Sequence, residues 1–288
     1  MEKKDNSVKD LGIKRVYTPK QRKNRTTSRT LFILAVVCLI VGVALLLIEP
    51  IKNYRRNKII TNTIDDIKIQ MAEEPVSDVI PVYTMVVDKN DNVVNGEEYD
   101  YFGTDEEQAE QQRLFDEAMA NLPDDVTLTC IGIISIDSAG IEEPIWDNDS
   151  VIELRYGTGH HQTSCLPGES GNCTILGHRM RSTGTIFNRL NEVAIGDSIN
   201  IITIDGSEFV YEVDRVIVID PLDLESYIDA DDGEGSQITL VTCEYTAEGK
   251  MRLLVIGHLV SASYSQTYIN SFNAGTVSTD GSTAESGN

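Results

Sequence analysis

The chain has 288 residues, of which 41% are hydrophobic, so it is long enough for one or two folded domains with a substantial core. Its formal net charge of -22 is unevenly distributed: residues 1–30 hold ten Lys or Arg and three Asp or Glu, which leaves a net charge of -29 on the remainder. A domain with that charge repels a polyanion, so nucleic acid is excluded as a partner.

An uncharged run of 18 residues, LFILAVVCLIVGVALLLI from Leu31 to Ile48, follows the basic segment. As a helix it spans about 27 Å, close to the thickness of a bilayer's hydrocarbon core. A cleaved signal peptide is the alternative, but the run is longer than a usual signal core and no small-residue cleavage site follows it. The sequence therefore predicts an uncleaved transmembrane anchor over residues 31–48. The basic tail, residues 1–30, is expected in the cytoplasm and the acidic part outside the cell.

Residues 49–125 are predicted to form an acidic, largely helical spacer or lid. Four apolar residues recur there at helical spacing: Ile60, Ile64, Ile67 and Met71. They predict an amphipathic helix that ends before Pro75. The segment DVIPVYTMVVDKNDNVVNG then predicts two short strands around the turn residues Lys89 to Asn92.

A second helix in this spacer is predicted from Thr104 and Glu107, which form a capping-box pattern. Behind it, five apolar residues recur on one helical face: Leu114, Phe115, Ala118, Met119 and Leu122. We expect the helix to run to about Leu122, with Pro123 beyond its end. The many carboxylates of the spacer are expected to form a solvated face.

From Val126 the pattern changes to short alternating runs separated by Gly, Asp, Asn and Pro. The runs are TLTCIGIISI, NCTILGH, SINIITI, EFVYEVDRVIVI, QITLVTC and RLLVIGHLV. Many short strands at this spacing predict an antiparallel sandwich or barrel over residues 126–262. Residues 263–288 are rich in Ser, Thr, Gly and Asn and are predicted to be a disordered polar tail.

Cys243 stands where the apolar run QITLVTC breaks, and Arg252 opens the next run nine residues later. A chain that leaves one strand at Cys243 and returns through the short loop Glu244 to Met251 forms a hairpin, which places the thiol and the guanidinium at the same end of the sheet. His178 follows NCTILG in the same way, where a strand meets a loop. By contrast, Cys130 inside TLTCIGI and His258 inside LLVIGHLV are expected to be packing residues.

Cys, His and Arg together are a minimal set for acyl transfer. A thiol of ordinary pKa, about 8.5, is only a few per cent thiolate at neutral pH, although the thiolate is the nucleophile. An imidazole can take or give the proton, and a guanidinium can stabilise an oxyanion on the attacked carbonyl. The candidate catalytic residues are therefore Cys243, His178 and Arg252.

Two other arrangements of these residue types are weighed against that interpretation. A zinc site could use His160, His161, Cys165, Cys173 and His178, but their spacing follows no paired ligand pattern, so no metal or other cofactor is predicted. No loop shows an alternating Asp/Asn series ending in Glu, and calcium is left open. Cys165 and Cys173 are the only cysteines close in sequence, and a disulfide between them is also left open.

Four segments occur in a specific order between residues 127 and 260: GNCTILGHR, IFNRL, IGDSI and TLVTC, with Arg252 opening the run after the last. This combination, and above all PGESGNCTILGHR with ITLVTC, resembles the sortase family of Gram-positive surface transpeptidases. The resemblance implies an eight-stranded β-barrel. It also implies that Cys243 is the nucleophile, that His178 is the general acid and later the base, and that Arg252 positions the substrate and steadies the oxyanion.

The resemblance implies partners as well. The substrates would be surface proteins with a Leu-Pro-x-Thr-Gly-like sorting signal, and the acceptor a peptidoglycan precursor or a pilin amine. The run VIDPLDLESY favours class C, D or E, although no Asp-Pro-aromatic lid motif lies upstream of the predicted β-rich domain. Two alternatives remain: a cysteine endopeptidase with water as acceptor, and a non-catalytic anchored surface β-domain.

Overall fold

The computed structural model of the chain describes residues 19–72, 82–91, 104–179, 186–228, 230, 233, 235–247, 249–267 and 269. The chain divides into two compact units, residues 1–50 and residues 51–288. Of the predicted segments, the strand expected after Asn92, most of the basic tail and nearly all of the polar C-terminal tail lie outside the described residues.

One long helix, α1 (Pro19–Ala72), contains both the predicted membrane span and the predicted stalk helix. Pro50 lies inside it, and the helix ends before Pro75, as the sequence predicts. Among the described residues, one helical segment, Arg29–Ala72, is long and apolar enough to cross a membrane; its most apolar window has a mean hydropathy of 3.4 and is not buried. Length and composition therefore agree with a membrane anchor or a signal segment.

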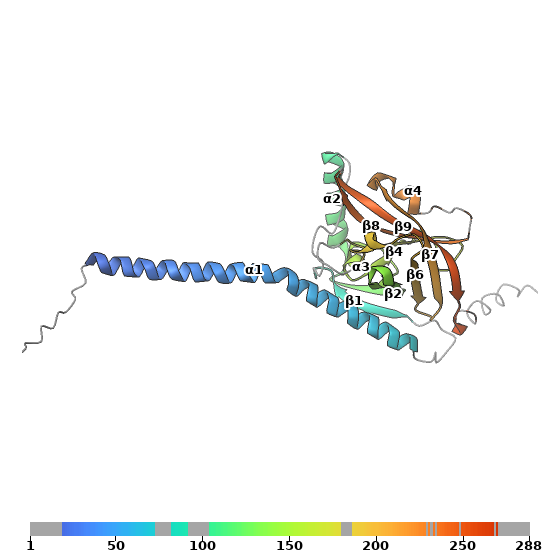
Figure 1. Cartoon of the computed structure of the whole chain (residues 1–288), viewed down its shortest axis with the longest axis horizontal. Coiled ribbons are helices and arrows are strands. Elements are labelled where there is room, and N and C mark those ends of the chain that lie inside the picture. The colour runs from blue at the N-terminus through green and yellow to red at the C-terminus, as the bar shows by residue number, and fades with distance from the viewer. Residues whose placement is uncertain are drawn as a thin grey trace, which may run out of the picture. The chain divides into compact units, whose positions relative to one another are not determined.

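Among the residues that the structure describes, nine strands make up a single sheet. Figure 1 shows how the sheet is arranged. In chain order the strands are β1 (Tyr83–Asp88), β2 (Asp125–Ile136), β3 (Ile141–Trp146), β4 (Thr158–His160), β5 (Gly171–Leu176), β6 (Ser198–Thr203), β7 (Glu208–Ile219), β8 (Ser236–Thr246) and β9 (Gly249–Ser263). All six alternating runs of the sequence form strands of this sheet, which confirms the β-rich region.

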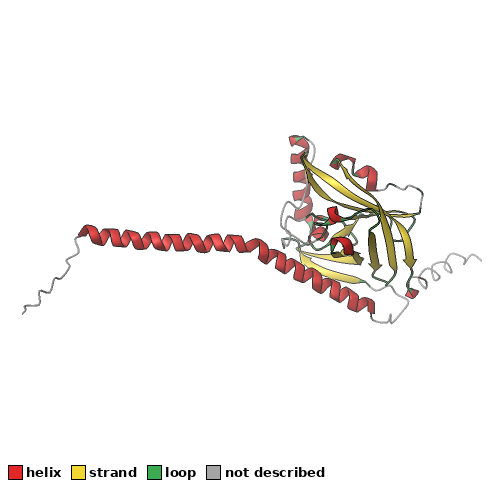
Figure 2. Ribbon diagram, viewed as in Figure 1, coloured by secondary structure: helices red, strands yellow, loops and turns green. Residues whose placement is uncertain are grey.

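Eight of the strands close into a ring, in the order β2-β3-β4-β5-β8-β9-β7-β6, because β6 pairs back onto β2 (Figure 2). β1 pairs with the first half of β2, outside this closure. The predicted number of eight strands is thereby confirmed for the ring. The expectation of an antiparallel sheet is wrong, since β3 pairs with β4 and β5 with β8 in parallel.

Sequence patterns miss β3 and β4 for physical reasons. β3 reads IEEPIW, and its two glutamates and a proline interrupt the apolar alternation that marks a strand. Nevertheless Glu143 is buried, because it has a partner for its charge inside the protein. β4 has three residues and carries no periodic signal at all.

Short helices connect the strands. They are α2 (Asp105–Asn121), α3 (Val151–Arg155), α4 (Glu225–Ile228) and three 3₁₀ segments, Asp137–Ala139, Leu190–Glu192 and Pro221–Asp223. The predicted capping box is confirmed at the start of α2: Thr104 Oγ1 accepts from the Glu107 backbone N–H, and the Glu107 carboxylate accepts from the Thr104 N–H at 2.8 Å. Leu122 caps the other end, close to the predicted boundary.

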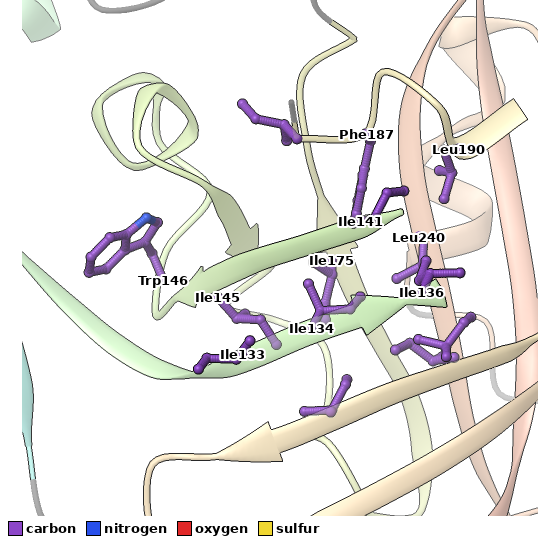
Figure 3. Packing of buried hydrophobic residues seen from close by; sticks show 14 of the residues in the cluster. Ile133, Ile134, Ile136, Ile141, Ile145, Trp146, Ile175, Phe187, Leu190 and Leu240 are labelled. Atoms are coloured by element: carbon purple, nitrogen blue, oxygen red, sulfur yellow. The ribbon is translucent and has the colours of Figure 1, made fainter. Parts of the chain in front are cut away.

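The core is a cluster of buried aliphatic side chains from many strands, of which Figure 3 shows Ile133, Ile134, Ile136, Ile145, Ile175 and Leu240. Ile60, Ile64 and Ile67 of α1 belong to the same cluster. The stripe that predicts an amphipathic stalk therefore contacts the domain core. In this way part of the predicted spacer contributes to the compact unit that holds the strands.

Truncating Ile67 tests this contribution, since its side chain is fully buried. Ile67→Ala in the 51–288 fragment is expected to cost about 2–5 kcal/mol of unfolding free energy, because it leaves a cavity in the core. Ile69→Ala is the matched control on the same helix, where the residue is 60% exposed and the change should stay within about 0.5 kcal/mol. Urea denaturation followed by circular dichroism measures both. If Ile67→Ala lowered the unfolding free energy no more than Ile69→Ala does, α1 would not contribute to this core.

Candidate active site

Cys243 and Arg252 face each other across the antiparallel pair β8 and β9. Their backbones are register partners, and Arg252 Nη1 lies 3.5 Å from Cys243 Sγ. The prediction that the two side chains meet is confirmed, but the expected loop is not. Residues 244 to 246 pair with 249 to 251, so the ribbon continues past Cys243 and the thiol lies three residues inside β8.

His178 reaches the same place through the parallel pairing of β5 with β8. Leu176, the last residue of β5, is the register partner of Val241, so β5 ends two residues before the level of Cys243 on β8. Beyond β5, the Gly177 N–H donates to the Val241 carbonyl at 3.0 Å, and Thr242 Oγ1 donates to the Gly177 carbonyl at 2.7 Å. Gly177 thus lies beside Thr242, and the residues that follow each of them, His178 and Cys243, are neighbours.

Gly177 is required at the turn into His178. A Cβ added there would lie 2.6 Å from the Phe187 ring and 2.7 Å from Ile186 Cγ2, closer than real side chains approach. The backbone of this position consequently packs directly on two buried side chains. The Phe187 N–H also donates to the His178 carbonyl at 3.2 Å, so the residues after the undescribed segment 180–185 return to hold the histidine backbone.

A cavity of about 790 Å³ contains Cys243, His178 and Arg252 in its lining. One wall comes from α2, which stands beside the ends of β8 and β9 (Figure 1), and another from the start of α3. The apolar lining residues are Phe115, Ala118, Met119, Leu122, Val126, Val151, Ile152, Leu154, Leu176, Pro221, Leu224 and Val241. The cavity therefore places an apolar surface next to the thiol, the imidazole and the guanidinium.

Burial controls the protonation of His178. It lowers the imidazole pKa to about 4, and the positive charges of Arg56, Arg155 and Arg252 act in the same direction. The buried Nε2 has no hydrogen-bond partner among the described residues. At neutral pH the imidazole is therefore uncharged, and one ring nitrogen is available for proton transfer.

The Cys243 thiol is protonated in the same resting state. Burial raises its pKa, while Arg252 and Arg179 act against burial by favouring the thiolate. The resting pair is thus a neutral thiol and a neutral imidazole. Proton transfer between them gives a nucleophile, an acid and a fixed positive charge in one cavity, which is the equipment for acyl transfer through a thioester.

Comparison with known proteins identifies the family. The model of the Sortase domain matches residues 134–260. Group B Streptococcus Pilus Island 1 Sortase C2 is 31% identical over 46% of this chain and 74% of its own, with a TM-score of 0.42. The chain belongs to the sortase family. The matched region includes all three candidate catalytic residues and most of the strand ring.

Two further sortases are similar to this chain. Streptococcus agalactiae sortase C1 is 32% identical over 47% of this chain and 69% of its own, with a TM-score of 0.42. Sortase A of Bacillus anthracis is 28% identical over 130 residues, which are 45% of this chain. The match spans 60% of the length of that curated relative. Solved sortases C and curated sortases A are thus both among the relatives of this sortase.

The remaining cysteines and histidines of this sortase lie elsewhere. Burial raises the pKa of the Cys130 thiol to about 12, and the buried residue packs in the core as predicted. His258 Nδ1 pairs with Asp214 on the neighbouring strand and does not line the cavity. Cys165 and Cys173 are both free thiols, so the structure contains no disulfide between them.

The zinc constellation is not brought together either. His161 Nδ1 contacts Asp149 Oδ2 at 2.7 Å, and His160 Nε2 contacts the Cys165 carbonyl at 2.9 Å. His178 instead lies in the cavity with Cys243. Within the part of the chain that the structure describes, no group of three or more His, Cys, Asp or Glu side chains could hold a metal ion.

Two features of the site are not predicted from the sequence: the wall formed by α2 and the charges of two arginines near His178. The apolar stripe of α2 predicts a helix, but nothing in it indicates that Phe115 and Met119 form a wall over the thiol. Arg56 and Arg155, whose charges act on His178, lie in α1 and α3 and have no local signature. A long-range contact map is the signal that could have found both.

Removing the Arg252 charge should raise the Cys243 pKa further, because that charge favours the thiolate. Arg252→Gln is expected to move the pH midpoint of Cys243 alkylation upward, and each unit lowers the thiolate fraction at neutral pH about tenfold. Lys250→Gln, which removes a cation from the same ribbon, should leave the midpoint in place. Iodoacetamide labelling of the Cys243 peptide, measured by mass spectrometry across pH, gives both curves. An identical midpoint in the two variants would show that the Arg252 charge does not favour the Cys243 thiolate.

The α2 wall should restrict access to the thiol. Phe115→Ala and Met119→Ala are expected to increase the labelling rate of Cys243 severalfold, because each removes a side chain that lines the cavity. Leu114→Ala is the control, since Leu114 is 51% exposed and does not line it. Cys165 provides a reference rate within the same molecule. Unchanged labelling in both cavity variants would refute a covering role for α2.

Proposed function

We propose that this chain is a membrane-anchored cysteine transpeptidase that cleaves a Leu-Pro-x-Thr-Gly-like sorting signal and transfers it to an amine. The observation that carries the proposal is that Cys243 on β8, Arg252 on β9 and His178, just after β5, line one cavity. Membership of the sortase family supports the reaction class. The apolar helix near the N-terminus supports the anchor and an extracellular domain.

In the first half-reaction the thiolate of Cys243 attacks the carbonyl carbon of the signal's threonine. The new C–S bond forms while the carbonyl oxygen becomes negative, and the guanidinium of Arg252 steadies that charge. The C–N bond to glycine then breaks, and the amine leaves with the proton that His178 received from the thiol. The product is a thioester on Cys243 and a free glycine amine.

In the second half-reaction an incoming amine replaces the thiol. The neutral imidazole of His178 takes the proton of the attacking amine, a new amide bond forms, and the C–S bond breaks to release Cys243. The low pKa of His178 suits this step, since it keeps the imidazole in its basic form at neutral pH. The same geometry with water as nucleophile gives hydrolysis, which is the competing reaction.

The acceptor is proposed to be a peptidoglycan precursor or a pilin lysine. Two of the solved relatives named above are sortases C, and one of them is named for a pilus island, which favours a pilin amine. The apolar cavity lined by Leu176, Leu224 and Val241 is proposed to take the apolar part of the signal. A class C, D or E assignment is consistent with these features.

The decisive experiment uses the full chain in detergent with a panel of sorting-signal peptides. Mass spectrometry should detect a thioacyl adduct on Cys243, and added triglycine, diaminopimelate or Nα-acetyl-lysine should convert that adduct into a new amide. Cys243→Ala should abolish the adduct, whereas Cys165→Ala should retain it. His178→Ala should lower the rate about 100- to 10,000-fold, since proton transfer contributes that much.

Two outcomes would contradict the proposal. Hydrolysis that no amine diverts would favour the endopeptidase alternative. Absence of any adduct across the panel, together with normal surface-protein display in cells that carry Cys243→Ala, would favour a non-catalytic surface domain.

A further inference from the structure

Arg56 forms a buried ion pair beside the candidate active site. It lies on α1, is 1% exposed, and its Nη2 is 3.5 Å from Glu143 Oε2 on β3. Its Nε also donates to the Arg155 carbonyl at 3.3 Å. An adjacent pair, Lys68 with Glu142 at 2.6 Å, joins the same two elements but is about half exposed. Burying charged groups costs free energy, which an exposed ion pair avoids. The buried pair of Arg56 and Glu143 therefore needs a physical explanation, whereas the half-exposed pair of Lys68 and Glu142 does not.

The second carboxylate oxygen of Glu143 holds a strained backbone. Glu143 Oε1 accepts from the Ile186 N–H at 2.5 Å. Ile186 has φ of +50°, the only positive value at a non-glycine residue in the described part of the chain. A β-branched residue rarely adopts this left-handed conformation, which persists only where the surroundings impose it. The Glu143 carboxylate and the burial of the Ile186 side chain supply that constraint.

Ile186 is directly connected to the histidine. It forms a β-bridge with Arg179, and its Cγ2 occupies the space next to Gly177 that a Cβ would need. The next residue, Phe187, donates its N–H to the His178 carbonyl. A shift of the Ile186 backbone would therefore pass to His178 through contacts on both sides of the imidazole-bearing residue.

We propose that Glu143 is a positioning residue for His178: its Oε1 fixes Ile186 and through it the imidazole, while Arg56 balances the buried charge. This inference rests on the proposed function, because it assigns a role in that reaction. It predicts that the acceptor atom at position 143 matters for catalysis independently of the ion pair. A stabilising ion pair alone would give the opposite pattern, in which loss of charge matters and the acceptor does not.

Two double variants separate these roles. Arg56→Met with Glu143→Gln removes both charges but keeps an oxygen that can accept from the Ile186 N–H. Arg56→Met with Glu143→Leu removes both charges and the acceptor, and apolar replacement of a buried pair is often tolerated by the fold. Glu143→Asp retains the charge but shortens the side chain by one methylene, so the carboxylate no longer reaches the Ile186 N–H. This single variant tests the same contact if the Met and Leu variant does not fold.

The first readout is kcat for thioacyl formation by the full chain in detergent. Both double variants lack the Arg56 charge that acts on His178, so the informative comparison is between the two of them. The Met and Leu variant should have a kcat about 100-fold below that of the Met and Gln variant, with little change in KM, because a misplacement of about 1 Å has that effect. Glu143→Asp should lose about as much relative to the unsubstituted protein. Lys68→Met with Glu142→Gln is the matched control on the same two elements and should leave kcat unchanged.

The second readout is the His178 imidazole signal in NMR titrations, which needs no sorting signal. The charges that act on His178 are those of Arg56, Arg155 and Arg252. The other titratable groups in the lining of its cavity are Cys243, Arg179, Asp149, Glu153, Tyr245 and Lys250. The two double variants change these groups identically. A higher His178 pKa in the Met and Leu variant than in the Met and Gln variant would thus report greater solvation of the ring.

The two readouts keep this inference distinct from the proposed function. Absence of acyl transfer in the unsubstituted protein would contradict the proposed function, while the NMR comparison would still test the positioning. Double variants that share one kcat and one His178 pKa would overturn the role of Glu143. So would a Glu143→Asp protein that is folded and indistinguishable from the unsubstituted chain in both measurements.

Discussion

The parallel pairing of β5 with β8 is the constraint on which the site depends. A hairpin is enough to bring Arg252 to Cys243, because the two residues are nine apart in sequence and register partners. His178 has no such local route, and it reaches the thiol because Leu176 and Val241 pair at the same edge of the ring. Parallel strands need a crossover, here formed by β6 and β7, and those same strands close the ring onto β2 and β9. The same set of pairings therefore closes the ring and places His178 near Cys243.

Burial and positive charge act against each other on Cys243 and together on His178. Burial raises the thiol pKa and lowers the imidazole pKa, so it stabilises the neutral pair. Arg252 favours the thiolate but also disfavours the imidazolium. The guanidinium therefore cannot by itself drive the proton from sulfur to nitrogen. In the reaction that we propose, the negative charge that develops on the substrate's carbonyl oxygen pairs with Arg252 while the thiol loses its proton. On that proposal the neutral pair is stable at rest and becomes reactive when a substrate occupies the cavity.

Features of this fold that depend on residues close in sequence are predictable from the sequence, and features that depend on distant residues are not. Alternating runs locate six of the strands, the capping box locates α2, and the nine-residue spacing places Arg252 near Cys243. These features depend on neighbours in sequence. β3 is missed because its burial of Glu143 relies on Arg56, which lies 87 residues away. The antiparallel expectation fails because Leu176 and Val241 are paired through a crossover that no local pattern encodes. The roles of Cys243, His178 and Arg252 come from resemblance to a family, and only their proximity comes from geometry.

The second half of α1 shows that the catalytic unit begins well before the region matched by the family model, which starts at residue 134. Ile60, Ile64 and Ile67 fill part of the core, and β1 extends the edge of β2. Arg56 follows the last residue of the apolar run, Ile48, by eight positions and carries a charge that acts on His178. A segment that looks like a spacer in sequence thus has a face in the core and a charge near the site. Because buried contacts of this kind connect α1 to the rest of the fold, we expect a substitution in its buried face to change the environment of His178.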